Sequence, residues 1–213
     1  TDAEGNSYRI QPEESGSQDD DTSTSQGQIA LTAERVAQVG DFNADVLSKK
    51  YGQVRFERGP GKYAFDDGKE AWYRKSVKLD RFYKPFAKDY IAPWKLIPEG
   101  ETDVVTAHYE GKQRIDVSKL VFTSDAKSPA LPSSYDETSR TWSIKLPSVA
   151  SGATYDVFAV YEGEVLGKLH VVSYAKQRHK VTLVPINDAK LDKTHIEREL
   201  NAVYTPVGVH FDV

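Results

Sequence analysis

The chain has one histidine pattern at helical spacing, the pentapeptide HIERE, which starts at His195. A helix that binds catalytic zinc carries H-E-x-x-H, in which two histidines one turn apart ligate the metal and the glutamate acts as general base. In HIERE the glutamate position holds Ile196 and the second histidine position holds Glu199. The pattern therefore predicts a solvent-exposed helix face, and we assign no catalytic or metal-binding residue to it.

A second set of spaced oxygen ligands occurs in DFNAD, where Asp41, Asn43 and Asp45 stand at positions 1, 3 and 5 of a calcium loop. Such a loop needs glycine at position 6 and a bidentate glutamate at position 12. Those positions hold Val46 and Gly52, so the segment is predicted to be a helix-capping turn. The sequence contains no cysteine, which excludes disulfides, thiol catalysis and cysteine-ligated zinc. No cofactor is predicted.

Aromatic side chains are concentrated between residues 63 and 94. The sequence holds 3 Trp, 12 Tyr and 8 Phe, and nine of them lie in this stretch: Tyr63, Phe65, Trp72, Tyr73, Phe82, Tyr83, Phe86, Tyr90 and Trp94. Two interpretations stay open. The rings can form an aromatic core, or Trp72, Tyr73 and Trp94 can form a face that binds a glycan or a protein. Acidic residues nearly balance the basic ones here, which argues against a groove for nucleic acid.

The charge of the chain is unevenly distributed. Residues 1–28 contain seven acidic residues against Arg9 alone, a net charge of −6 in a chain whose total is −4. The segment is also rich in Ser, Thr, Gln and Gly, and it cannot bury enough apolar surface to offset its ordering entropy. We therefore predict an acidic flexible leader or linker over residues 1–28. The chain as a whole has no excess of basic residues, so no nucleic-acid partner is predicted.

The 213 residues suffice for one large or two ordinary domains. No apolar run approaches the length that a membrane span requires, so no span is predicted. Residues 29–100 are predicted to form an aromatic-rich α+β region. Within it the segment 53–65 alternates apolar and polar residues on both sides of Gly59-Pro60-Gly61, which predicts a hairpin.

Residues 101–178 show alternation with a period of two in five runs separated by Gly, Pro, Ser and Asp. One run places Trp142, Ile144 and Leu146 on one face of a strand. The run YDVFAVY, residues 155–161, places four residues on one face and Phe158 and Val160 on the other. Short strands with polar turns at this spacing predict an antiparallel sandwich.

Residues 101–178 resemble an immunoglobulin-like module of the cysteine-free kind found in large secreted bacterial surface proteins. The resemblance implies a β-sandwich and a location outside the cytoplasm, either secreted or at the cell surface.

Residues 179–213 predict a strand, a helix and a second strand. The segment KVTLVPI, residues 180–186, is apolar on both faces, as in a strand buried on both sides. The helix is predicted to start at Thr194, with Glu197 completing a capping box, and its apolar stripe is Ile196, Leu200, Val203 and Tyr204. Short connections imply a βαβ unit with parallel strands. Two strands cannot bury both faces of a sheet, so we expect this unit to be the start of a truncated α/β domain that continues beyond Val213.

This ending resembles the entry to zincin-type metallopeptidase domains, which begin with a strand, a helix and a parallel strand. The resemblance implies that any metal-binding helix lies further along the polypeptide.

The sequence thus predicts a β-dominated, multi-module α+β protein: an antiparallel Ig-like sandwich with a terminal βαβ element. The leading functional hypothesis is an N-terminal, non-catalytic part of a secreted or surface bacterial protein that positions or covers a downstream domain, which the resemblance makes a metallopeptidase. The alternative is a self-contained module that binds a glycan or a protein through residues 63–94. No catalytic motif is found within the chain, so whether it takes part in an enzyme stays open.

Overall fold

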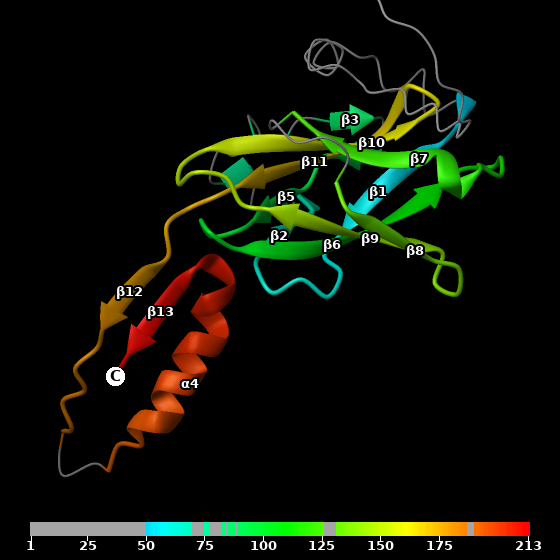
Figure 1. The fold of residues 1–213 in the computed structure, drawn as a ribbon. Coiled ribbons are helices and arrows are strands. Elements are labelled where there is room, and N and C mark those ends of the chain that lie inside the picture. Colours follow the sequence, from blue (N-terminus) through cyan, green and yellow to red (C-terminus); the bar gives the residue numbers. More distant parts are fainter. Residues whose placement is uncertain are drawn as a thin grey trace, which may run out of the picture.

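The computed structural model describes residues 50–69, 75–76, 82–83, 85–87, 89–125, 131–186 and 190–213. The predicted leader, the DFNAD turn, Trp72 and Tyr73 lie outside these residues. The described chain is dominated by β-strands that pair mostly antiparallel, as predicted. It consists of two facing sheets, which we call the two-sheet body, and a strand–helix–strand segment at residues 177–213, which we call the terminal unit (Figure 1).

The first sheet of the body has four strands in the order β1-β6-β9-β8, and every pair in it is antiparallel. Its strands are β1 (Gln53–Glu57), β6 (Thr102–Glu110), β8 (Ser133–Asp136) and β9 (Thr141–Pro147).

The second sheet has five strands in the order β2-β5-β11-β10-β7. Within it only β5 and β11 pair in parallel. Its strands are β2 (Phe65–Asp66), β5 (Trp94–Leu96), β7 (Leu120–Ser124), β10 (Thr154–Tyr161) and β11 (Glu164–Val172). A short hairpin of β3 (Pro85–Ala87) and β4 (Tyr90–Ile91) lies beside the body, and a 3-10 turn (Val117–Lys119) precedes β7.

Strands from both sides of position 100 share these sheets, because β1 pairs with β6 and β5 pairs with β11. The predicted division at residue 100 therefore does not coincide with a boundary between sheets. The predicted hairpin is wrong: β1 and β2 lie in different sheets. The intervening glycines instead allow a close approach to β6, since a Cβ on Gly61 would lie 2.3 Å from the Val104 carbonyl oxygen.

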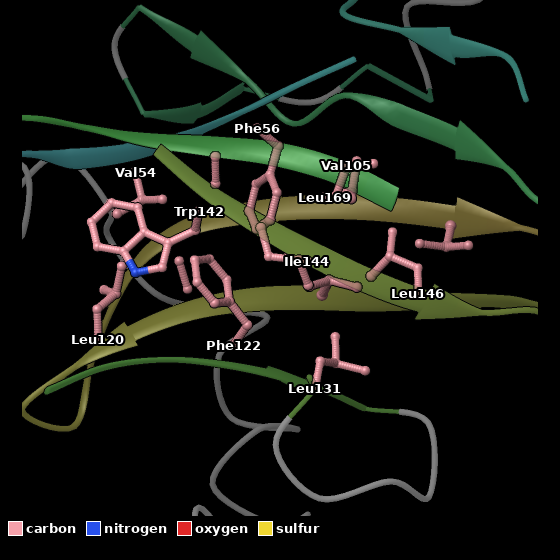
Figure 2. Close-up of a cluster of buried hydrophobic side chains, with 14 of the residues drawn as sticks. Val54, Phe56, Val105, Leu120, Phe122, Leu131, Trp142, Ile144, Leu146 and Leu169 are labelled. Carbon is pink, nitrogen blue, oxygen red and sulfur yellow. The ribbon is translucent and has the colours of Figure 1, made fainter. Parts of the chain in front are cut away.

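The main core fills the space between the two sheets (Figure 2). Trp142, Ile144 and Leu146 are all buried, which confirms the predicted inward face of β9. The predicted two-sidedness of β10 is also confirmed. Its residues 155, 157, 159 and 161 belong to the main core, whereas Phe158 and Val160 pack with Val165 in a second cluster on the outer face of the second sheet.

A buried ion pair joins the sheets at one end. The Lys95 ammonium of β5 lies 2.5 Å from a carboxylate oxygen of Asp103 on β6, with the side chains 0% and 7% exposed. Asp103 also accepts hydrogen bonds from the backbone N–H groups of Lys62 and Tyr63 at 2.9 and 2.8 Å, and Lys95 donates to the Tyr63 carbonyl at 2.6 Å. Burial lowers the pKa of Lys95, and the contact with Asp103 opposes that shift. Each of the two buried charges therefore has an opposite charge and backbone hydrogen-bond partners within the fold.

The terminal unit comprises β12 (Gln177–Lys180), α4 (Lys193–Tyr204), a 3-10 turn (Thr205–Val207) and β13 (Val209–Asp212). β12 and β13 pair in parallel. The strand lies earlier than predicted: residues 181–186 form no strand, and Val184 and Ile186 are 76% and 74% exposed.

The predicted cap of α4 is also wrong. Asp192, not Thr194, caps the helix and accepts a hydrogen bond from the His195 backbone N–H. Asp192 stands two residues before Thr194, and its side chain reaches the first turn directly. Glu197 is therefore free of the capping role, and its carboxylate accepts a hydrogen bond from the Val213 N–H.

Candidate functional site

Of the three residues predicted for a glycan- or protein-binding face, the structure describes Trp94. Trp94 lies on β5, on the outer face of the second sheet, and is half-buried. Its indole N–H donates to the Phe82 carbonyl at 3.1 Å. Its ring stacks on His170 of β11, with ring centroids 4.5 Å apart and an interplanar angle of 24°. One face of the ring and its hydrogen-bond donor are therefore already occupied, and the predicted face built with Trp72 and Tyr73 stays a prediction.

Next to Trp94, on the same face of the sheet, lie charged side chains whose proximity was not predicted from the sequence. His170 Nδ1 lies 2.5 Å from Asp156 Oδ1, and the Lys168 ammonium lies 2.6 Å from Asp156 Oδ2. The Asp156 backbone N–H donates to Asp125 Oδ1 at 2.7 Å. These residues occupy neighbouring strands β11, β10 and the end of β7. They form one polar row across the outer face of the sheet.

The pKa of Asp156 is lowered from its ordinary value. Desolvation alone would raise it, but the hydrogen bonds from His170 and Lys168 and the charges of both groups outweigh that effect. Both carboxylate oxygens are used by these partners. The row is therefore a network in which both oxygens of Asp156 are already paired. It holds β10 and β11 in register and orients the His170 imidazole under Trp94.

This network predicts a pH dependence of stability. An aspartate with a lowered folded pKa stabilises the native state above its unfolded pKa of about 3.9, and that contribution disappears as the pH falls through the folded pKa. We expect the free energy of unfolding of Asp156→Asn to lie below that of the parent at pH 5, with the gap closing below about pH 4. Urea titrations from pH 5 to pH 3 measure it. A gap that stays constant over this range would mean that Asp156 is not held ionised by its neighbours.

A small pocket opens between β1 and the β3–β4 hairpin. Its volume is about 120 Å³, and it is lined by Arg55, Phe56, Glu57, Asp67, Lys69, Asp89, Tyr90, Ile91 and Pro93. Arg55 is engaged by Glu110 at 2.6 Å and by the Asp89 carbonyl at 2.8 Å. Sites for small molecules are typically at least about 300 Å³, so this pocket is too small and its main cation too fully paired to be the leading candidate.

No cluster of three or more His, Cys, Asp or Glu side chains suited to a metal ion occurs among the described residues. His195 and Glu199 of the HIERE segment are 56% and 59% exposed, as predicted for a solvated helix face. Within the described part of the chain, no helix is both long and apolar enough to cross a membrane.

The strongest candidate is the apolar surface of the terminal unit, which projects away from the body (Figure 1). Six of the nine large hydrophobic side chains that are exposed in the described residues lie in this short segment: Val184, Ile186, Leu191, Val203, Tyr204 and Val207. Neither β12, α4 nor β13 contains a buried residue. The predicted stripe of α4 is only partly covered, since Val203 is 66% exposed and Tyr204 contacts Phe211 edge-on, with centroids 5.1 Å apart.

The terminal unit is nevertheless internally ordered by polar contacts. The Asn201 side chain donates to the Phe211 carbonyl and accepts from the Phe211 N–H, both at 2.8 Å. Arg178 binds Asp212 through two hydrogen bonds of 2.5 and 2.6 Å. Towards the body, the Pro206 carbonyl accepts a hydrogen bond of 2.8 Å from the Ala64 N–H. These contacts order the terminal unit and attach it to the body, while its apolar side chains stay exposed to solvent.

Comparison with known proteins identifies no family for this chain. No protein-family model matches it, and no curated protein matches it. Among solved structures, it is similar to a crystal structure of a Photobacterium 2,6-sialyltransferase in a ternary complex with CMP and lactose. The sequence identity is 16% and the TM-score 0.28, over 55% of this chain and 24% of that one. The chain thus spans about a quarter of that enzyme's length, and a likeness at this TM-score carries no argument about fold or function.

Proposed function

We propose that this chain is a non-catalytic module that positions or covers a further α/β domain of the same polypeptide, and that the terminal unit belongs to the sheet of that domain. The observation that carries the proposal is the concentration of exposed apolar side chains on the terminal unit. Exposed apolar side chains gathered in one segment are typical of a surface that a partner covers.

The energetics support the same conclusion. Burying a Val, Leu or Ile side chain contributes about 1.5–3 kcal/mol, and the terminal unit leaves Val184, Ile186, Leu191, Val203 and Val207 exposed. An isolated pair of strands is at best marginally stable in water. Val203 lies on α4, Val207 in the 3-10 turn and the other three in the connection between β12 and α4. Additional structure that covers this connection and the helix would bury these side chains, and a strand added beside β12 would extend the sheet.

In this proposal the two-sheet body is an immunoglobulin-like sandwich and the terminal unit is the βαβ start of the further domain. The mostly antiparallel pairing of the body and the parallel pairing of β12 with β13 support both assignments. We extend the proposal to a zincin-type metallopeptidase as the further domain, in a secreted or surface-attached bacterial protein. The zinc-binding residues would then lie in the further domain.

The intact mass of the native polypeptide, isolated from its source, tests the proposal. We expect a mass well above the 23.8 kDa of this chain, with additional sequence that contains strands and an H-E-x-x-H helix. An additional sequence without H-E-x-x-H would remove the metallopeptidase assignment alone. A native mass equal to that of this chain would overturn the proposal as a whole.

A further inference from the structure

The two outer edges of the β12–β13 sheet differ, and the difference indicates where a further strand can join. In a β-strand the N–H and C=O of one residue point to the same side, and successive residues alternate between sides. The N–H and C=O of Phe211 are both bound by Asn201, and the Val213 N–H is bound by Glu197 at 3.2 Å. Helix α4 therefore closes the outer edge of β13 with its own side chains.

The outer edge of β12 is open. Gln177 and Val181 direct their N–H groups towards β13, donating to the Gly208 and Asp212 carbonyls at 2.9 and 2.7 Å. By alternation, Arg178 and Lys180 direct their backbone N–H and C=O groups away from β13. Within the described residues, neither backbone has a hydrogen-bond partner on that side, and all four residues of β12 are exposed. Such a row of unpaired groups is a template for another strand.

The side chains of β12 restrict which strand fits. Arg178 and Lys180 share one face of the strand, and Arg178 is already neutralised by Asp212, whereas Lys180 has no ion pair among the described residues. Like charges placed opposite each other across a strand pair are destabilising. A second copy of β12 would bring such charges together, and acidic residues would complement them. On the other face His179, which is hydrogen-bonded to Gln177, lies beside Phe211 of β13 with ring centroids 5.7 Å apart, so apolar side chains of an added strand would pack against these rings.

We propose that the outer edge of β12 is a strand-acceptor site for an amphipathic β-strand in which acidic residues alternate with apolar ones. The acidic side chains would lie beside Arg178 and Lys180, and the apolar ones would extend the face formed with Phe211. The assignment of this strand to the further α/β domain rests on the proposed function; the site itself follows from the edge and its charges.

Nuclear magnetic resonance with peptide probes tests the site on the 213-residue chain. The probe is a peptide of about eight residues that alternates glutamate and valine, long enough to match a typical strand. The control peptide replaces each glutamate with lysine. We expect the acidic peptide to shift and protect the amides of Arg178 and Lys180, and to bind less tightly as salt is raised. The basic peptide should leave these amides unchanged.

Matched variants complete the test. Lys180→Glu should weaken binding of the acidic peptide about fivefold, whereas Lys190→Glu, the same charge change away from the strand, should not. Absence of binding, equal binding of both peptides, protection centred on residues 209–213, or dimerisation of the chain through β12 would each overturn the inference. None of these outcomes depends on whether a further domain exists, so the site and the proposed function fail separately.

Discussion

Replacement of Lys95 by methionine should lower the free energy of unfolding by about 3–5 kcal/mol, because it leaves the carboxylate of Asp103 buried without its counter-ion. The two charges lie 2.5 Å apart with almost no solvent contact, so water cannot replace the missing partner. For a chain of this length such a loss corresponds to a fall in Tm of roughly 6–20 °C. Urea unfolding followed by tryptophan fluorescence measures the effect.

A double-mutant cycle separates the ion pair from the loss of packing. Lys95→Met/Asp103→Asn removes both charges and keeps one side-chain oxygen, which can accept from one of the two N–H groups that Asp103 binds, those of Lys62 and Tyr63. It should therefore be more stable than Lys95→Met alone, which leaves a buried charge unpaired. Lys119→Met, which breaks the exposed pair with Glu162, serves as the control and should cost far less. Additive effects at positions 95 and 103 would show that the ion pair does not couple the sheets.

Replacement of Phe122 by alanine should cost about 3–5 kcal/mol, through lost burial and the cavity that the ring leaves. Phe122 is 1% exposed and makes edge-on contacts with Phe56 and Trp142, at centroid distances of 5.9 and 6.1 Å (Figure 2). Phe56 and Trp142 lie on strands of the opposite sheet, and paired strands move little, so we expect the cavity to stay largely unfilled.

Val121 provides the matched control for this variant, because it precedes Phe122 on the same strand and is 39% exposed. Val121→Ala should change the free energy of unfolding by only a small fraction of the Phe122→Ala effect. Comparable losses at both positions, measured by the same urea titration, would contradict the assignment of one face of β7 to the core.

The strand faces of the body could be predicted from the sequence because alternation is local. Trp142, Ile144 and Leu146 all point inward because residues two apart lie on the same face of a strand. Pairing between strands is not local, and the His170–Asp156 contact shows the consequence. A regular hairpin around the Glu162–Gly163 turn would place Asp156 opposite Leu169, but a bulge between Ala159 and Val160 shifts the register by one residue, so that Asp156 faces His170.

The terminal unit shows a different limit. The hydrophobicity of residues 180–186 suggested a buried strand, yet the paired strand is the polar segment Gln177–Lys180. A hydrophobic pattern shows that a segment is able to form a buried strand, but burial also needs other residues to cover it. Within the described residues nothing covers Val184 and Ile186. The buried lysine could not be anticipated either, since its partner Asp103 lies on a strand of the other sheet. The signal that could have located it is a lysine flanked by Trp94 and Leu96 in an apolar segment.

Cysteine accessibility on the native polypeptide shows directly whether a further domain covers the apolar side chains of the terminal unit. Because this chain has no cysteine, single cysteines at Val184, Ile186 or Val203 report their own exposure to a maleimide reagent, with Val121→Cys on the body as the control. We expect rapid labelling at all four positions in the 213-residue chain. In the native polypeptide, labelling should be strongly slowed at the three positions of the terminal unit and unchanged at position 121. Equally rapid labelling of the terminal unit in both proteins would contradict the claim that its apolar surface is covered by a further domain.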